Sequence, residues 1–324
     1  MYSPDPASVG SVRTGSGSPS RSRVPAHDDA LVRAIGGTPI VSLTKIAADA
    51  GSAFELWAKA EHLNPTGSVK DRAARGIVLD AMANGRLPPG RTLMDASSGN
   101  TAVAYAMLGA RLGFPVEIIL PANAHPSRVA RIRAYGADVV FTDASDGTDG
   151  SQREARRRAA ASPDRYFYPD QYNNPSNPNA HYATTGPEIW SQTEKRVTHF
   201  VAGVGTGGTI SGAGRFLKEM NPKIRVVGVE PSGPLHGIEG LKHIPTALRP
   251  STYDERLVDS TVRVETEDAV AMQHRLARDE GLSVGASAGA AVWAAVGVGR
   301  SSPGAVVVTI LPDGGHEPEG KEAP

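Results

Sequence analysis

Short apolar runs alternate with longer amphipathic segments between residues 54 and 160. Short runs bounded by turn residues predict strands, and segments with apolar positions three and four apart predict helices. The predicted strands are residues 54–61, 91–96, 116–120 and 138–142, and the predicted helices are 71–85, 102–112, 126–135 and 151–160. Strands that alternate with helices are typical of a doubly wound sheet, so residues 31–175 predict one α/β lobe.

The alternation resumes after a turn-rich loop at residues 170–175. The predicted helices are 186–193, 210–220, 265–280 and 287–298, and the predicted strands are 199–204, 225–230 and 305–311. Residues 231–249 are dense in Gly, Pro and His and predict a mobile loop over a site. The predicted fold is therefore α/β with two doubly wound lobes, the second over residues 176–313.

The ends of the chain differ in composition from the lobes. Residues 1–30 are rich in Ser, Gly, Pro and Arg, which predicts a disordered leader. The leader lacks the apolar core of a secretion signal, so a cytoplasmic location is expected. Residues 314–324 predict a polar tail, and no apolar run is long enough to span a bilayer.

The overall charge narrows the class of partner. Among the 324 residues, 34 are Lys or Arg and 34 are Asp or Glu, so no charge excess favours nucleic acid or an anionic membrane. A small molecule is the expected partner. The chain has no cysteine, which excludes disulfides and thiolate metal sites, and its nine histidines are scattered, so no metal is predicted.

Lys70 is the candidate for covalent chemistry, and the other motifs are interpreted as parts of the same site. It follows a Pro/Gly turn in the stretch N-P-T-G-S-V-K-D-R (64–72) and begins a predicted helix. The helix dipole and desolvation both disfavour a protonated amine there, and a neutral amine can form a Schiff base with an aldehyde. Lys70 is thus a candidate carrier of pyridoxal phosphate, although this stretch alone also fits a surface lysine beside a helix start.

A glycine-rich loop, G-V-G-T-G-G-T (203–209), lies between a predicted strand and a predicted helix. Its backbone N–H groups and the helix N-terminus predict a phosphate site. The loop also matches the dinucleotide pattern G-x-G-x-x-G, with Glu230 near the position of a ribose-binding acid. The residues alone therefore leave a nicotinamide cofactor open.

Two further polar segments begin predicted helices. The segment S-S-G-N-T (97–101) offers hydroxyl, amide and backbone N–H groups that could bind a carboxylate, whereas an ordinary N-cap explains only one of them. Ser287, in G-A-S-A-G (285–289), is either an N-cap or a neutral partner for a pyridine nitrogen. Such a hydroxyl, unlike a carboxylate, would not keep that nitrogen protonated.

Taken together, these motifs resemble the cysteine synthase and cystathionine β-synthase family of fold type II pyridoxal-phosphate enzymes, whose fold is like that of the tryptophan synthase β-subunit. The resemblance spans roughly residues 35–313 and includes D-Q-Y-N-N-P (170–175) and E-G-L-K-H (239–243) in family order. It implies that the cofactor lies in the cleft between the lobes and that residues 42–63 cross to the second lobe.

The resemblance also implies a role for each site residue. Lys70 would form the Schiff base with pyridoxal 5'-phosphate and serve as the catalytic residue. Asn100 would bind the phenolic oxygen of the cofactor, and Ser287 its ring nitrogen. The residues implied for the phosphate are Gly205, Thr206, Gly207, Gly208 and Thr209. The residues implied for the substrate carboxylate are Ser97, Ser98, Thr101 and Gln171.

The implied reaction is a β-replacement on an O-activated L-serine by a sulfur nucleophile, which gives L-cysteine. O-acetylserine is the first choice of donor; O-phosphoserine is the second, because Lys242, His243 or Arg249 could meet its phosphate. A homodimer is implied, with a sulfur-carrier protein or a serine acetyltransferase as further partners. The alternatives are a cystathionine β-synthase-like or β-elimination enzyme, a nicotinamide-dependent oxidoreductase and an inactive binding paralogue.

Three departures from the family pattern bear on these expectations. Ser97 replaces the usual Thr and Ala102 the usual Gly, which would reshape the carboxylate site slightly. The polar C-terminus replaces apolar and aromatic residues of the relatives, and the absence of cysteine excludes a thiolate-ligated haem.

Overall fold

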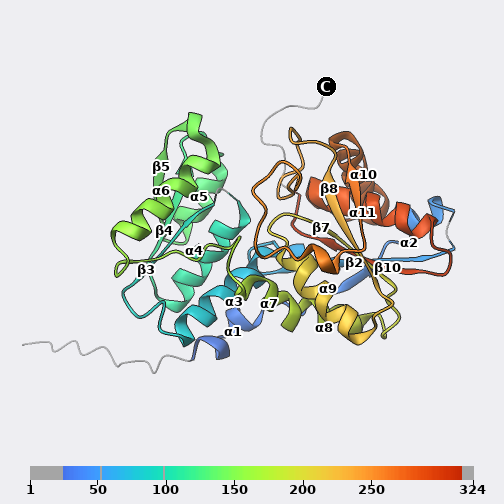
Figure 1. Ribbon diagram of the computed structural model, residues 1–324, viewed down its shortest axis with the longest axis horizontal. Coiled ribbons are helices and arrows are strands. Elements are labelled where there is room, and N and C mark those ends of the chain that lie inside the picture. The colour runs from blue at the N-terminus through green and yellow to red at the C-terminus, as the bar shows by residue number, and fades with distance from the viewer. Residues whose placement is uncertain (1–24, 52, 98, 316–324) are drawn as a thin grey trace, which may run out of the picture.

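The smaller of two sheets forms the core of the first lobe. The computed structural model describes residues 25–315 except 52 and 98, and Figure 1 shows its two lobes side by side. The smaller sheet is parallel, and its order is β5 (Asp138–Thr142), β4 (Val116–Pro121), β3 (Thr92–Ala96), β6 (Tyr166–Phe167). Apolar residues of α3 (Lys70–Ala83) and α4 (Asn100–Leu112) pack on one face, and α6 (Gly147–Ala161) packs on the other. The remaining long helix, α5, spans Pro126–Ala134.

The larger sheet has six strands. Their order is β1 (Ile40–Ser42), β2 (Glu55–Ala60), β10 (Val306–Leu311), β7 (His199–Gly203), β8 (Arg225–Pro231), β9 (Ser260–Val264). Only the β1–β2 pair is antiparallel within this sheet. One core joins the sheet to α2 (Thr44–Asp49), α10 (Thr266–Glu280) and α11 (Ala286–Arg300). A second core joins it to α8 (Thr185–Gln192) and α9 (Gly208–Met220). Both sheets thus have helices on two faces, as the α/β prediction requires.

The strand predicted over residues 54–61 belongs to the larger sheet, in agreement with the expectation that residues 42–63 cross to the second lobe, although the alternation alone placed it with the first lobe. It forms β2 and pairs with β10, more than 200 residues away in the chain, in register from Glu55–Val306 to Ala60–Leu311. Its neighbour β1 begins at Ile40. Periodicity identifies a strand but not its partner, because strands of either sheet have the same apolar pattern.

Three other segments differ from the predicted pattern. Residues 25–30, placed in the leader, contain the turn Ala26–Asp28 and the start of α1 (Ala30–Arg33), and Asp29 caps that helix through the N–H groups of Leu31 and Val32. The unpredicted edge strand β9 is partly exposed, so its apolar signal is weak. The unpredicted helix α7 (Ser176–Ala183) contains Asn and Pro but packs against α3 and α9. The rest of the leader lies outside the described residues, as do residues 316–324 of the tail.

The strand directions decide where a site can form. Loops at the carboxyl ends of β3, β7 and β10 line a common space between the sheets. Helices α3 and α7 lie between the lobes below this space (Figure 1). In open parallel sheets, ligands bind beside the carboxyl ends of the strands.

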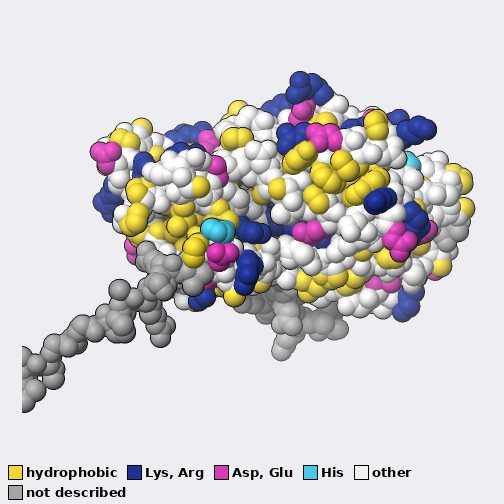
Figure 2. Space-filling view, turned by 90° about the horizontal axis from the view of Figure 1, so that it is seen from below, with side chains coloured by type: hydrophobic (Ala, Val, Ile, Leu, Met, Phe, Trp, Pro, Cys, Tyr) yellow, Lys and Arg dark blue, Asp and Glu magenta, His cyan; other side chains and the backbone are white. Residues whose placement is uncertain are grey.

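The surface carries positive and negative side chains, in keeping with the equal numbers of basic and acidic residues in the sequence. Figure 2 shows Lys and Arg side chains intermingled with Asp and Glu over one face of the molecule. Within the described part of the chain, no helix is both long and apolar enough to cross a membrane. Among those same residues, no cluster of His, Asp and Glu has the arrangement of a metal site.

Candidate active site

A cavity of about 580 Å³ lies between the lobes. Such a volume is typical of a site for a small ligand or cofactor. Most of the residues singled out from the sequence line it, namely Lys70, Ser97, Asn100, Thr101, Gln171, Gly205, Thr206, Gly207, Thr209 and Ser287. Gly208 belongs to the same glycine-rich loop and is the first residue of α9, between the lining residues Gly207 and Thr209. Ser98 lies outside the described residues.

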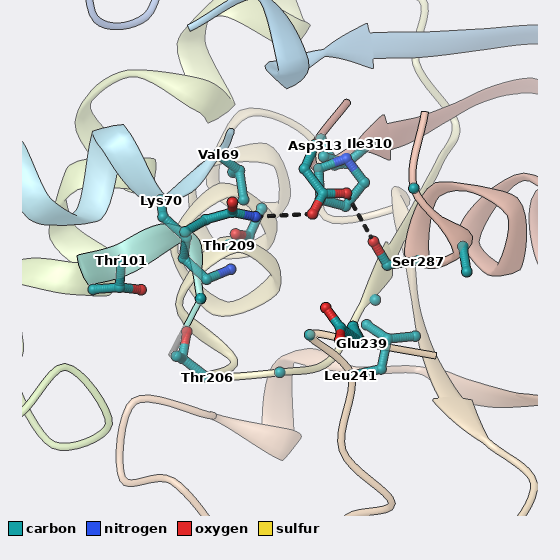
Figure 3. A pocket seen from close by; sticks show the side chains of 18 of the residues that line it. Val69, Lys70, Thr101, Thr206, Thr209, Glu239, Leu241, Ser287, Ile310 and Asp313 are labelled. Carbon is teal, nitrogen blue, oxygen red and sulfur yellow. Dashed lines mark hydrogen bonds between the residues drawn. The ribbon is translucent and has the colours of Figure 1, made fainter. Parts of the chain in front are cut away.

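Lys70 enters the cavity from the first residue of α3 (Figure 3). The preceding turn is held by the hydrogen bond from Val69 N to Pro312 O, 2.7 Å long, so the start of α3 is attached to the end of the larger sheet. Burial lowers the pKa of the Lys70 amine, and the charge of Asp313 partly opposes that effect. The balance favours a deprotonated, nucleophilic amine more than water does.

The glycine-rich loop connects β7 to α9. Gly207 has φ +80°, a left-handed conformation that favours glycine. A Cβ atom on Gly205 would overlap the carbonyl oxygen of Gly240, and one on Gly208 would overlap the Asn177 amide. The loop therefore packs too closely for side chains at these positions. Its backbone lies at a helix N-terminus, where Gly208 N donates to Thr206 Oγ1 at 3.2 Å.

Two side chains from α7 support this loop, and the sequence did not indicate either. Asn177 donates a hydrogen bond to Thr206 Oγ1 at 3.1 Å. His181 is buried, with Nδ1 2.9 Å from Thr185 Oγ1 and Nε2 3.3 Å from Thr209 Oγ1. Burial lowers the pKa of His181 to about 3, so the imidazole is neutral and supports the loop without adding charge. These residues belong to a helix that the apolar pattern failed to predict.

The segment after β3 forms another part of the cavity wall. Thr101 donates a hydrogen bond to Gln171 Oε1 at 2.9 Å, which joins two residues predicted for the same carboxylate. Ser97 also lines the cavity, and its Oγ accepts from Gly99 N at 3.3 Å. The described residues of this wall are polar and uncharged, which suits a substrate that brings its own negative charge.

Asp313 is the main residue that sequence reasoning missed. Its Oδ2 accepts a hydrogen bond from Asn100 Nδ2 at 2.8 Å, and its Oδ1 accepts one from Ser287 Oγ at 3.4 Å. Figure 3 shows Lys70 and Ser287 on opposite sides of the cavity with Asp313 between them. The available signal was its position two residues after the last strand, at the same sheet edge as the glycine loop.

Part of the segment predicted as a loop over the site, residues 231–249, lines the cavity. Gly237, Glu239, Gly240 and Leu241 line the cavity. Glu239 forms an ion pair with Arg128 of α5, which connects this loop of the larger lobe to the smaller lobe at the cavity wall. Opening the two lobes would separate this pair.

A buried ion cluster fixes the helix that carries Lys70. The guanidinium of Arg72, 2% exposed, lies between the carboxylates of Glu61 and Glu188, with both shortest contacts at 2.7 Å. Lys59 of β2 contacts the same Glu188 carboxylate at 2.6 Å. The cationic neighbours lower the pKa of Glu188 to about 2 although burial acts in the opposite direction. Two cations and two carboxylates thus join β2, α3 and α8 without a net charge.

Comparison with known proteins gives one consistent result. The family model of pyridoxal-phosphate dependent enzymes matches residues 31–313. A cysteine synthase of Aquifex aeolicus is 47% identical over 294 residues, which cover 89% of this chain and 90% of the relative.

Solved structures agree with the sequence relatives. The structure of a cysteine synthase from Entamoeba histolytica matches with a TM-score of 0.85 and 31% identity, over 96% of this chain and 91% of that one. An O-ureido-L-serine synthase matches with a TM-score of 0.83 and 34% identity, over 90% and 96% of the two chains. With a family match over residues 31–313 and relatives of this identity and coverage, the chain belongs to the family of pyridoxal-phosphate dependent enzymes.

Proposed function

We propose that this pyridoxal-phosphate dependent enzyme makes L-cysteine by β-replacement on an O-activated L-serine, with O-acetylserine as the donor. The observation that carries the proposal is the placement of Lys70 in one cavity with the glycine loop. The similarity to cysteine synthases supports the choice of reaction. Membership of the pyridoxal-phosphate family leaves no role for a nicotinamide cofactor at the glycine loop.

The residues present fit the cofactor. The glycine loop forms a cradle that a Cβ at Gly205 or Gly208 would fill, and its backbone N–H groups suit a phosphate. A lysine with a lowered pKa lies in the same cavity, where it can react with an aldehyde. Asn100 would hold the phenolic oxygen, and Ser287 the ring nitrogen. When bound, the cofactor supplies a conjugated ring that delocalises the charge developing at the substrate Cα.

The other residues position the substrate and move its proton. Ser97, Thr101 and Gln171, together with Ser98, bind the substrate carboxylate through neutral hydrogen-bonding groups. Lys70 Nζ takes the proton from the substrate Cα as acetate leaves Cβ, and it returns a proton to Cα after hydrosulfide has added to Cβ. The loop over the cavity limits the access of water during these steps.

O-phosphoserine is a second donor that one observation favours. Arg128 pairs with Glu239, and Arg249, one of the residues suggested for the phosphate, pairs with Glu255. Lys242 has no carboxylate within ion-pair distance among the described residues, and its Nζ lies 4.9 Å from the ring centroid of Tyr172, which lines the cavity. A phosphate on the substrate could therefore meet an unneutralised ammonium group.

One experiment separates these functions. Purified enzyme loaded with pyridoxal phosphate is given O-acetylserine or O-phosphoserine, each with sulfide, and cysteine is measured. We expect O-acetylserine to be used faster, and Lys242→Ala to lower the use of O-phosphoserine more than that of O-acetylserine. Cofactor binding without cysteine from either donor would identify an inactive paralogue or another β-replacement enzyme.

The assembly follows from the same proposal. We expect a cytoplasmic homodimer, with a serine acetyltransferase or a sulfur-carrier protein as its protein partner. Sedimentation of the purified chain tests the dimer, and co-sedimentation with either protein tests the partner.

A further inference from the structure

Two loops of the cavity wall lie close together although they follow strands of different sheets. Gln171 and Tyr172 lie in the loop after β6 of the smaller sheet, and Thr206 lies in the loop after β7 of the larger sheet. All three residues line the cavity. In the proposed function Gln171 binds the substrate carboxylate and Thr206 binds the cofactor phosphate. Contacts between these loops therefore connect the two binding sites.

One bridge between the loops is the side chain of Asn177, on α7. Its Nδ2 donates to Gln171 O at 2.8 Å and to Thr206 Oγ1 at 3.1 Å. A carbonyl oxygen such as Gln171 O can only accept, which fixes the orientation of the amide. Asn177 is 1% exposed, and its Oδ1 lies beside Gly208, where a Cβ atom would overlap it. One buried amide thus joins the backbone of the first loop to a side chain of the second.

The second bridge is the side chain of Thr252, which is 5% exposed and which the sequence did not indicate. Its hydroxyl donates to Thr206 O at 2.6 Å and lies 3.0 Å from Tyr172 O. A hydroxyl has one proton, so the shorter contact is the stronger hydrogen bond. Thr252 N also donates to Tyr172 O at 3.2 Å. Thr252 therefore holds both loops, each through its own donor.

The bridges leave a donor on each loop for a ligand. Thr206 Oγ1 accepts from Asn177 and, at 3.2 Å, from Gly208 N, so both its lone pairs are used and its proton remains for a phosphate oxygen. Gln171 Oε1 accepts from Thr101 at 2.9 Å, so the –NH₂ group of Gln171 remains to donate to a carboxylate. Each residue can bind its ligand while the bridges hold the backbone behind it.

We propose that Asn177 and Thr252 are positioning residues that couple the two sites, so that a loop held by the cofactor phosphate also holds Gln171 where it binds the substrate carboxylate. This inference rests on the proposed function of the site. Asn177 contacts the side chain of Thr206 and Thr252 contacts its main chain, so the loss of either bridge should loosen both loops. Coupling between two binding sites is reciprocal, and each ligand should therefore strengthen the binding of the other.

The test compares the affinities for cofactor and substrate in Thr252→Val, which removes the hydroxyl with little change in volume. Cofactor-free protein is titrated with pyridoxal phosphate, and KM and kcat for O-acetylserine are then measured at saturating cofactor. We expect the dissociation constant of the cofactor and KM each to rise roughly fivefold, the effect of about one hydrogen bond. The value of kcat should change less than about twofold, because the lost contact is made before and during the reaction. Thr252→Ser restores the hydroxyl and should restore both affinities.

A second measurement distinguishes coupling from a general loss of structure. If Thr252 acts through Gln171, Thr252→Val should raise KM much less in a Gln171→Ala background, because the residue that it positions is then absent. Thr261→Val makes the same substitution at an exposed residue of β9 and should keep the wild-type values. Asn177→Ala removes the other bridge and provides the same test if Thr252→Val does not fold.

Several outcomes would overturn the inference. Weaker cofactor binding with an unchanged KM would mean that Thr252 holds only the glycine loop, and unchanged values of both would mean that it holds neither. An equal rise in KM with and without the Gln171 side chain would show that the effect does not pass through Gln171. Failure of the proposed function would look different, because the wild type would then bind no cofactor or make no cysteine.

Discussion

The two sides of the cavity offer different kinds of group. Residues 203–209, here called the backbone wall, present main-chain N–H groups and little side-chain bulk. Asn100, Ser287 and Asp313, here called the side-chain wall, present an amide, a hydroxyl and a carboxylate. A larger side chain should disrupt the backbone wall, whereas truncation of a side chain should disrupt the side-chain wall. Substitutions that add atoms therefore test the first wall, and substitutions that remove atoms test the second.

Lys70 lines the same cavity as both walls, and its loss should have the largest effect. We expect Lys70→Ala to lower cysteine formation at least about 1000-fold, because the proposed mechanism assigns the transfer of the Cα proton to Lys70. Removing a desolvated amine should leave the melting temperature unchanged or raise it. Steady-state rates of the loaded protein measure the first effect, and thermal unfolding of the cofactor-free protein measures the second. Cysteine formation at the wild-type rate would contradict the assignment.

Gly205→Ala tests the backbone wall by addition. Its Cβ would overlap the Gly240 carbonyl oxygen, so the loop must shift away from the phosphate position. Overpacking of this kind costs about 3 kcal/mol, which corresponds to a loss of roughly 100-fold in affinity for pyridoxal phosphate. Gly233→Ala is the matched control, since a Cβ there meets no atom within 4 Å. Equal affinities of the two variants, measured by cofactor titration, would refute the close-packing argument.

Asp95→Asn tests the strand β3, which leads to Ser97 and then to Asn100 of the side-chain wall. Asp95 lies on β3 two residues before Ser97, and burial raises its pKa from 3.8 to about 7. The folded protein therefore binds this proton more tightly than the unfolded chain, and its free energy of unfolding falls as pH rises from about 4 to 7. At pH 8 the asparagine variant should be more stable by on the order of 2 kcal/mol, and at pH 4 the difference should shrink.

Denaturant unfolding of Asp95→Asn at both pH values gives that comparison. Asp138→Asn, on the exposed edge strand β5, controls for the loss of a surface charge. If the stability difference between Asp95→Asn and the wild type were the same at pH 4 and pH 8, burial would not be raising the pKa of Asp95.

Asn100→Ala tests the side-chain wall by removal and should have the smallest effect. It deletes the hydrogen bond that we propose between Asn100 and the cofactor, together with the 2.8 Å hydrogen bond from Asn100 to Asp313, so we expect roughly tenfold weaker cofactor binding. Asn84→Ala, at the exposed end of α3, is the control. If Asn100→Ala binds the cofactor as tightly as the control does, the amide does not contribute to binding.

The two walls also differ in how far the sequence predicts them. The backbone wall follows from seven adjacent residues, because glycine content and a strand–loop–helix context determine its chemistry. The α/β class and most strands follow from periodicity for the same local reason. The side-chain wall was predicted in part, since Asn100 and Ser287 begin helices whose motifs resemble a known family.

The site residues that the sequence did not predict depend on contacts between distant parts of the chain. Asp313 acquires its place because β10 ends beside the Lys70 turn, and no local pattern marks that neighbour. His181 and Asn177 lie on a helix of weak intrinsic propensity that forms by packing. The cluster of Arg72, Glu61 and Glu188 brings together charges that would ordinarily be predicted on the surface.

The pairing of β2 with β10 has a consequence for how the protein folds during synthesis. The smaller sheet uses only residues 92–167, so all its strands have been made when about half of the chain has left the ribosome. The larger sheet cannot close until residues 306–311 emerge, and until then β2 lacks the strand that lies on its inner side. Closure over so long a separation is slow. Completion of the larger sheet, which also brings Asp313 beside Lys70, should therefore be the last major event of folding.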